Sequence, residues 1–293
     1  MLLFTYIKDS QNKLGYVFDG RWYDLGHELA ISGSCVSLRK AKNLVELMEQ
    51  DLLNHTDLVT ITSRPGKITL FYEKLIFQSP AGIPRNIIGV GRNYGAHVAE
   101  GVLEPQKEPR LLAKLTSSIT GHREKIYRPM NVKKLDWEGE LGVIIGKTLK
   151  AADETQSLAA IAGYTSLNDI TAREFQFDRS PGQTTFAKSF DTFCPIGPAM
   201  LVANDIIQHD EFKIETYVNG KCVQQGQTDD LIFSIPYLIS YISQYVSLQP
   251  GDVIATGTPA GVGHFREPPV YLQPGDVVRV NVSGLPHLEN KIV

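Results

Sequence analysis

Acidic side chains crowd the entry to an apolar segment in the middle of the chain. The stretch "KKLDWEGELGVIIGKTL" carries Asp136, Glu138 and Glu140 at the start of a run of apolar residues. That run, residues 141–145, predicts a buried β-strand. Because side chains alternate across a strand, Glu138 and Glu140 point to the same face, and carboxylates that close repel one another unless a cation lies between them. Asp136 shares their parity but lies further out along the chain.

A second acidic landmark offers a third ligand for a metal site. The segment "GYTSLNDITAREFQ" contains a short β-like run that ends at Asn168 and Asp169, where a carboxylate can face a cleft. Together with Glu138 and Glu140, Asp169 would form an oxygen-only set of the kind that Mg²⁺, Mn²⁺ or Ca²⁺ prefers. About half of an octahedral shell would remain for water or substrate oxygens. We therefore interpret the acids as ligands of a divalent cation; the alternative is a solvated strand edge whose acids lie in water.

A histidine and a glutamate follow one another in "NIIGVGRNYGAHVAEG". On a helical turn His97 and Glu100 face the same way, so the carboxylate can orient the imidazole as a general base that activates water. The alternative is an exposed histidine on a polar turn. The nearby glycines Gly91, Gly95 and Gly101 would permit a lid that orders when substrate binds.

Two further segments offer groups to an anionic ligand. Lys188 lies between two phenylalanines in "TTFAKSFDTFCPIGP". It is an ordinary surface lysine unless a metal site lies beside it, in which case it would pair with a substrate carboxylate or a developing enolate. The loop "ATGTPAGVG" offers backbone N–H groups and Thr258 to an anion, although a tight turn needs no ligand.

Composition and motif spacing exclude several function classes. The chain has 293 residues, and its 42% hydrophobic and 21% charged content is typical of a globular protein. A formal net charge of −3 and a pI near 6.2 give no basic surface for nucleic acid. The glycines at 89, 91 and 95 miss a dinucleotide-binding fingerprint by one position, and neither a G-x-S-x-G elbow nor a Walker motif occurs.

Cysteine usage and hydropathy indicate the compartment. Three scattered cysteines exclude a zinc site and a disulfide framework, and they favour a reducing, cytoplasmic setting. No apolar run reaches membrane-spanning length, and the apolar start of the chain is too short for a secretory signal, so we expect no membrane partner.

The elements that must position these residues divide into two parts. Residues 1–80 alternate short β-like runs with turns and contain one helical pattern, which predicts a small N-terminal α/β domain. A stretch marked by proline and glycine, residues 78–86, reads as a linker. Residues 81–293 have many short β-rich runs between glycines and prolines, which predicts a mainly β domain with a few helices.

Individual helices and turns can also be predicted. Helical patterns occur over residues 39–52, 153–162 and 234–246, the last with Ser234 as its N-cap. Two near-copies of "LQPGDV" each place Pro-Gly before a β-branched run, which predicts a turn that leads into a strand.

Taken together, the motifs resemble the fumarylacetoacetate hydrolase family from about residue 83 to the end. The resemblance implies the mixed β-roll of that family and a homodimer. It rests on six segments that follow the family's order: "GVGRNYGAHVAE", "LDWEGELGVIIGK", "GYTSLNDITAREFQ", "AKSFDTFCPIGP", "VNGKCVQQGQTDDLIFSIPYLISYIS" and "LQPGDVIATGTPAGVG".

The resemblance also assigns roles to individual positions. Glu138, Glu140 and Asp169 match the metal-binding acids of the family, and His97 and Glu100 match its lid dyad. The resemblance gives Lys188 a catalytic role at the substrate. The other positions that match substrate contacts are Gln176, Thr258 and Arg92.

The activity that this resemblance implies is hydrolysis of a carbon–carbon bond in 2,4-dioxo acids such as acylpyruvates or fumarylpyruvate. Mg²⁺ or Mn²⁺ would hold the 2-oxo acid and the enolate released from it, and His97 would activate water. Alternatives within the family are an oxaloacetate decarboxylase and a 2-hydroxymuconate-type isomerase. The alternative of another class is a non-catalytic protein that binds a metal and an organic acid. In that case Ala96 would mark the loss of catalytic function, because members of the family often have aspartate directly before the histidine.

Overall fold

Strands dominate the chain. The structure, a computed structural model, describes residues 1–102, 104, 106–203 and 211–293, with 34% of residues in strands and 24% in helices. The described strands form a 12-stranded sheet, a five-stranded sheet and a two-stranded ribbon. The predicted class, mixed α/β with mainly β structure, is therefore confirmed.

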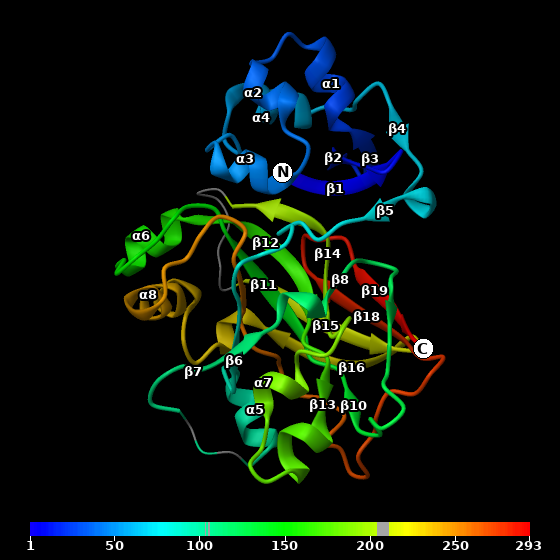
Figure 1. Ribbon diagram of the computed structural model, residues 1–293, viewed down its shortest axis with the longest axis vertical. Helices are drawn as coiled ribbons and strands as arrows, with labels where there is room; N and C mark the ends of the chain where they lie inside the picture. Colours follow the sequence, from blue (N-terminus) through cyan, green and yellow to red (C-terminus); the bar gives the residue numbers. More distant parts are fainter. Residues whose placement is uncertain (103, 105, 204–210) are drawn as a thin grey trace.

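The first 80 residues lie at one end of the molecule, drawn in blue and cyan in Figure 1. Their first strand pairs with the second along its whole length, and it also pairs with a strand of the main body at Leu2↔Leu201 and Leu3↔Met200. The N-terminal strands therefore extend the large sheet. Their elements are β1 (Leu2–Lys8), β2 (Gln11–Phe18), β3 (Arg21–Asp24), α1 (Leu25–Ile31), α2 (Val36–Lys40), α3 (Leu44–Glu49), α4 (Thr56–Thr62), β4 (Thr69–Leu70), η1 (Tyr72–Lys74) and β5 (Ile76–Phe77).

The single helix predicted over residues 39–52 is wrong. Two short helices, α2 and α3, occupy this stretch instead. Asn43 has an extended backbone between them, and its side chain accepts from the N–H of Glu46, which starts a new helix. The apolar spacing of the segment predicts its buried face, but the competing N-cap divides it.

The central part of the large sheet has the order β14–β12–β11–β17–β6–β7. Every residue of β11 and β12 is buried, which confirms the predicted buried strand and extends it to Gly139. These six strands are β6 (Ile87–Gly91), β7 (Arg110–Lys114), β11 (Gly139–Ile145), β12 (Ile161–Asn168), β14 (Cys194–Val202) and β17 (Val253–Ala255).

The remaining elements of the main body are short helices, short strands and the strands of the two smaller sheets. They are α5 (Gly95–Glu100), η2 (Thr116–Ser118), β8 (Ile119–Thr120), β9 (Lys125–Ile126), β10 (Leu135–Asp136), α6 (Glu154–Ala159), β13 (Thr171–Ala172), η3 (Glu174–Asp178), α7 (Thr184–Ala187), β15 (Lys213–Val218), β16 (Lys221–Gln227), η4 (Thr228–Asp230), α8 (Ile235–Tyr245), β18 (Val277–Val282) and β19 (Leu288–Ile292).

The two predicted helices of the main body are present. Ser234 caps α8 by accepting from the N–H of Tyr237, as its position predicts. Asp153 starts α6 with a capping box, but this helix ends at Ala159, because β12 begins at Ile161. The shorter α6 shows how a strong strand ends a weak helical pattern early.

The two Pro-Gly turns are built alike, as their sequence predicts. Gly251 and Gly275 have φ of 89° and 102°, which favours glycine. In each turn the aspartate after the glycine accepts from a backbone N–H three residues earlier, over 3.0 Å for Asp252 and 2.7 Å for Asp276.

The back of β11 packs tightly on the five-stranded sheet. Leu141, Val143 and Ile145 share one core cluster with residues of β15 and β18. A Cβ at Gly139 would lie 2.0 Å from Thr216 Oγ1 and 3.3 Å from Val280. Glycine at this position therefore lets β11 pack closely against the five-stranded sheet. This contact holds the strand in place and with it the opposite face, which carries the acids.

We expect Gly139→Ala to destabilise the protein by about 1–3 kcal/mol, because the added methyl group overpacks this contact. The measurement is urea denaturation followed by circular dichroism. Thr216→Ala should restore part of the loss, since it removes the oxygen nearest the new Cβ. Stability equal to wild type in Gly139→Ala would contradict this account of the contact.

Candidate active site

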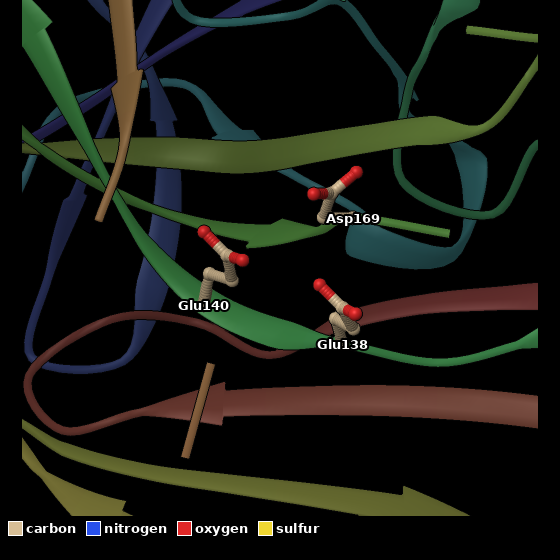
Figure 2. A group of neighbouring side chains, drawn as sticks. All are labelled: Glu138, Glu140 and Asp169. Atoms are coloured by element: carbon tan, nitrogen blue, oxygen red, sulfur yellow. The ribbon is translucent and has the colours of Figure 1, made fainter. Parts of the chain in front are cut away.

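Three buried carboxylates from two strands meet at one point. Glu138 directly precedes β11, Glu140 is the second residue of that strand, and Asp169 directly follows β12. Each offers one oxygen within 4.8 Å of the others, and Figure 2 shows the three side chains gathered around a common space. They are only 6%, 2% and 2% exposed. The solvated strand edge, the alternative drawn from the sequence, is therefore wrong.

The pairing of β11 with β12 sets this arrangement. Gly139 lies opposite Asn168 in the ladder, and the Asn168 side chain accepts from the N–H of Glu138 over 3.0 Å. The N–H of Asp169 in turn donates to the Glu138 carbonyl over 2.8 Å. Asp169 is thus held beside Glu138 by backbone geometry, although the sequence separates the two by a helix and two strands.

Lys188 lies directly against the acids. Its ammonium donates to Glu138 and Asp169, each over 2.7 Å, and to the Thr171 hydroxyl over 2.8 Å. Burial alone would lower the pKa of Lys188, but Asp169 and Glu138 outweigh burial and raise that pKa. A lysine ammonium has three N–H groups, and all three have acceptors here. Lys188 is therefore a fixed positive charge.

The acids differ in their electrostatic state. Burial would raise the pKa of Glu138, but Lys188 and Arg173 outweigh it and lower that pKa to about 2. Burial, then Asp169 and Glu138, raise the pKa of Glu140 well above its usual range. Its hydrogen-bond partner in the described chain is the N–H of Gly257, at 2.9 Å. A buried carboxylate beside two others, with no cation paired to it, fits the chemistry of a divalent-cation ligand.

A second lysine, Lys114, was not identified from the sequence. It ends β7, is buried, and donates to Asp169 Oδ1 over 2.5 Å. It also donates to the carbonyls of Lys188 and Phe193, the latter over 3.1 Å. Lys114 thus ties Asp169 to the backbone that carries Lys188. The only signal in the sequence is a lysine at the end of a short apolar run.

Asp136 lies further out than the other acids, as the sequence indicates, and it is neither part of the carboxylate cluster nor of the cavity wall. It is fully buried and accepts from the backbone N–H of Trp137, Gly263 and His264 and from Arg173 Nε over 2.7–2.9 Å. Arg173 in turn donates from Nη1 to Glu138 Oε1 over 2.7 Å. Asp136 therefore positions the arginine that orients a predicted metal ligand.

His97 is buried rather than exposed, so the alternative of an exposed histidine is wrong. Its Nδ1 lies 3.5 Å from Glu100 Oε2 and has no hydrogen-bond partner among the described residues. Both oxygens of Glu100 accept from the N–H of Gly261 over 2.9 and 3.0 Å. The ring of His97 packs against Phe265, with the ring centres 5.6 Å apart. The imidazole is thus held by packing, and Glu100 ties helix α5 to the glycine-rich loop.

A carboxylate from a distant segment holds the start of α5. Asp230, at the end of η4, accepts from the N–H of Ala96 over 3.0 Å. Gly95 is needed here, because a Cβ at this position would lie 2.9 Å from Asp230 Oδ1. The helix that carries His97 is therefore fixed to other segments at both ends.

One cavity collects nearly all of the predicted site residues. It has about 570 Å³ of empty space, part of it open to solvent. Glu100 lies outside its wall, and the hydroxyl of Thr258 is occupied by the Gly139 carbonyl at 2.9 Å and by Gln224 Nε2 at 2.8 Å. The predicted residues that line it are Arg92, His97, Glu138, Glu140, Asp169, Gln176, Lys188 and Thr258.

Buried acids, fixed cations and a histidine in one cavity are the components of an enzyme active site. Comparison with known proteins agrees. The family model described as "Fumarylacetoacetate (FAA) hydrolase C-terminal" matches residues 86–293. The mitochondrial oxaloacetate tautomerase FAHD2A of Bos taurus is 37% identical over 276 residues, which cover 92% of this chain and 87% of the relative. The tautomerase FAHD2A of Homo sapiens is 40% identical over 220 residues, covering 75% and 70%.

Solved structures agree in fold. The fumarylacetoacetate hydrolase from psychrophilic Exiguobacterium antarcticum is 32% identical with a TM-score of 0.83, covering 100% of this chain and 99% of the other. The 2-hydroxyhepta-2,4-diene-1,7-dioate isomerase from Mycobacterium marinum is 25% identical with a TM-score of 0.76, covering 100% and 98%. The chain belongs to the fumarylacetoacetate hydrolase family and is an enzyme of that family.

We expect Mg²⁺ to raise the melting temperature more at about pH 8 than at about pH 5.5. The raised pKa of Glu140 means that its folded form favours the protonated state, so without a cation its contribution to stability is lost as pH rises. A bound cation favours the ionised carboxylate and removes that loss. Thermal denaturation with EDTA or Mg²⁺ at both pH values measures the difference.

Glu140→Gln is the matched control for this experiment, because glutamine keeps the shape of the side chain but its amide group does not titrate. It should weaken Mg²⁺ binding and remove most of the stabilisation at high pH. An Mg²⁺ effect of the same size at both pH values, or an unchanged effect in Glu140→Gln, would show that Glu140 is not a ligand.

Proposed function

We propose that this enzyme interconverts the enol and keto forms of a 2-oxo acid of the oxaloacetate type and depends on a divalent cation. The observation that carries the proposal is the state of His97. It lines the same cavity as the three acids, is buried, and has Glu100 Oε2 3.5 Å from its Nδ1. Movement of one proton requires one such group and consumes no water.

Lys188 cannot take this role, because all of its N–H groups donate to fixed acceptors and its raised pKa keeps the ammonium charged. Its part is electrostatic: it holds Glu138 and Asp169 in place and places positive charge beside the reacting oxygen. This electrostatic role of Lys188 is narrower than the catalytic role that the family resemblance implies.

In the proposed reaction His97 accepts the proton of the hydroxyl group at C2 of the enol. The C2–O bond becomes a carbonyl as the electrons of the C2–C3 double bond take up a proton at C3. The imidazolium returns that proton, so the enzyme is unchanged after each turnover. Glu100, whose carboxylate is 3.5 Å from Nδ1, stabilises the charged imidazolium.

Glu138, Glu140 and Asp169 would hold the cation, Mg²⁺ or Mn²⁺, with Ca²⁺ accepted by the same oxygen ligands. When bound, such an ion supplies Lewis-acid stabilisation of negative charge on the 2-oxo oxygen. Arg173 faces the same cavity, and its Nη2 has no hydrogen-bond partner in the described chain. The positive charge of this guanidinium would attract the carboxylate next to the 2-oxo group.

The names of the relatives support this assignment, since the bovine and human proteins are called oxaloacetate tautomerases and the Mycobacterium marinum structure is called an isomerase. The two tautomerases are also called mitochondrial, so the cytoplasmic setting stays a prediction. In the part of the chain that the structure covers, no helix is long and apolar enough to cross a membrane. The homodimer is likewise a proposal that rests on the family resemblance.

A second candidate is hydrolysis of acylpyruvates, the first expectation from the sequence. The proximity of Glu100 to His97 favours it, because a histidine paired with a carboxylate can activate water. The water oxygen would add to the C4 carbonyl, the C3–C4 bond would break, and C3 would take up a proton to give pyruvate and a carboxylic acid. Decarboxylation of oxaloacetate would break the same bond with release of carbon dioxide.

The proposal is tested by following enol oxaloacetate in the ultraviolet and pyruvate release in parallel. We expect faster loss of the enol signal, stopped by EDTA and restored by Mg²⁺ or Mn²⁺. Pyruvate release from acetylpyruvate or oxaloacetate without faster tautomerisation would favour the second candidate or the decarboxylase. Absence of chelator-sensitive turnover of every acid would favour the non-catalytic binding protein.

Replacement of His97 separates proton transfer from cation binding. His97→Ala should lower kcat for tautomerisation by roughly 10²–10⁴-fold, the usual contribution of a general acid–base group. Mn²⁺ affinity, measured by calorimetry, should stay within a few-fold of wild type. As a control, His55→Ala at the N-cap of helix α4 in the N-terminal part should change neither quantity. Near-normal kcat in His97→Ala would require another proton carrier.

A further inference from the structure

Two arginines lie together in the wall of the cavity. Arg92 directly follows β6, and Arg110 begins β7, where it lies opposite Gly91 in the antiparallel ladder. Both line the cavity that holds the three acids. Arg110 is exposed and Arg92 is half-buried, so they lie toward its open side. The sequence pattern gives no signal for Arg110, which becomes visible only through the pairing of β6 with β7.

These arginines differ from the other cations of the site in having no acid partner. Lys114, Lys188 and Arg173 each make a short ion pair with a buried carboxylate. The side chains of Arg92 and Arg110 make no hydrogen bond or ion pair with any residue that the structure describes. The cavity therefore has an acidic inner end and a basic open side.

The pair is held in place against two unfavourable effects. Burial and the charge of Arg110 both lower the pKa of Arg92, so the two guanidinium groups repel one another. Arg92 also has φ of 59°, a left-handed conformation that is unfavourable for a residue with a side chain. Strain and like-charge repulsion without internal compensation are typical of a binding site whose ligand brings the missing charge.

Apolar side chains also contribute to the wall of the cavity. Val90, Leu112, Phe177 and Phe265 line it together with the charged groups. An apolar wall matches the carbon chain of a ligand, and a guanidinium fork binds a carboxylate through two parallel N–H bonds. The ligand that satisfies both ends is an acid with a 2-oxo group at one end and a second carboxylate at the other.

We propose that Arg92 and Arg110 form a subsite for this second carboxylate, so that the enzyme selects 2-oxo dicarboxylic acids over 2-oxo monocarboxylic acids. The inference rests on the proposed function in one respect, namely that the 2-oxo end of the ligand lies at the three acids. Arg110 is then a specificity residue: it contacts the distal end of the substrate and takes no part in the proton transfer.

The test uses binding of matched acids that need no turnover. Calorimetry of the full chain with Mg²⁺ compares 2-oxoglutarate with 2-oxopentanoate, and 2-oxoadipate with 2-oxohexanoate; in each pair a carboxylate replaces a methyl group. We expect wild type to prefer the dicarboxylate at least ten-fold in one pair or both. Arg110→Gln should reduce that preference to below three-fold and leave monocarboxylate affinity within two-fold of wild type.

Three further variants sharpen the comparison. Arg92→Gln should act like Arg110→Gln, and Arg110→Lys should keep part of the preference, because it keeps the charge but loses the fork. Arg39→Gln, at an exposed position on α2, removes one positive charge away from the cavity and should leave the preference unchanged. Circular dichroism establishes that each variant is folded.

Equal binding of both members of each pair by wild type would overturn the proposal. So would a preference that survives in Arg110→Gln and Arg92→Gln, or an equal loss of both ligands in Arg110→Gln. The result is independent of the activity assay. A preserved preference in a protein without tautomerase activity would overturn the proposed function alone, and tautomerase activity without the preference would overturn this subsite alone.

Discussion

The buried excess of negative charge around Glu140 is the constraint on which the site depends. Four carboxylates, those of Asp136, Glu138, Glu140 and Asp169, are almost fully removed from solvent. Three of them have short bonds to a lysine or arginine, and the fourth, Glu140, has only a backbone N–H within the described chain. Burying an unpaired carboxylate is costly, so a neutral Glu140 or an added cation must offset it. This requirement explains why a core strand carries acids at its start.

The large sheet fixes that arrangement, because the proposed ligands lie in or directly next to two paired strands. Glu138 and Glu140 share a face of β11, and the ladder with β12 sets Asp169 beside them. Gly139 lets the opposite face approach β15 and β18 closely, so the strand cannot shift without disturbing a packed core. Helix α5 is anchored by Asp230 at its start and by Glu100 at its end. The position of His97 therefore depends on contacts with segments more than a hundred residues away.

These facts also explain what could be predicted from the sequence. The common face of Glu138 and Glu140 follows from the two-residue period of a strand, which is a local property, and the apolar face of α8 follows in the same way. The hydrogen bonds of Asp136 and of Lys114 depend on which distant backbone groups approach them, and no local pattern encodes that. The helix expected over residues 39–52 failed for a local reason, since the cap at Asn43 competes with the apolar period.

The division of charge in the cavity bears on which reaction this site can perform. The cations of the inner end are bound to acids and cannot exchange protons readily, and the proposed proton carrier is His97 in the same wall. With a single carrier, what distinguishes tautomerisation from hydrolysis is whether water can lie beside the imidazole while the substrate is bound. A carboxylate held at the open side by Arg92 and Arg110 would help to close that route. The two arginines that select the substrate would then also favour proton transfer over cleavage. Exclusion of water by the bound carboxylate would link the specificity of the enzyme to its reaction type.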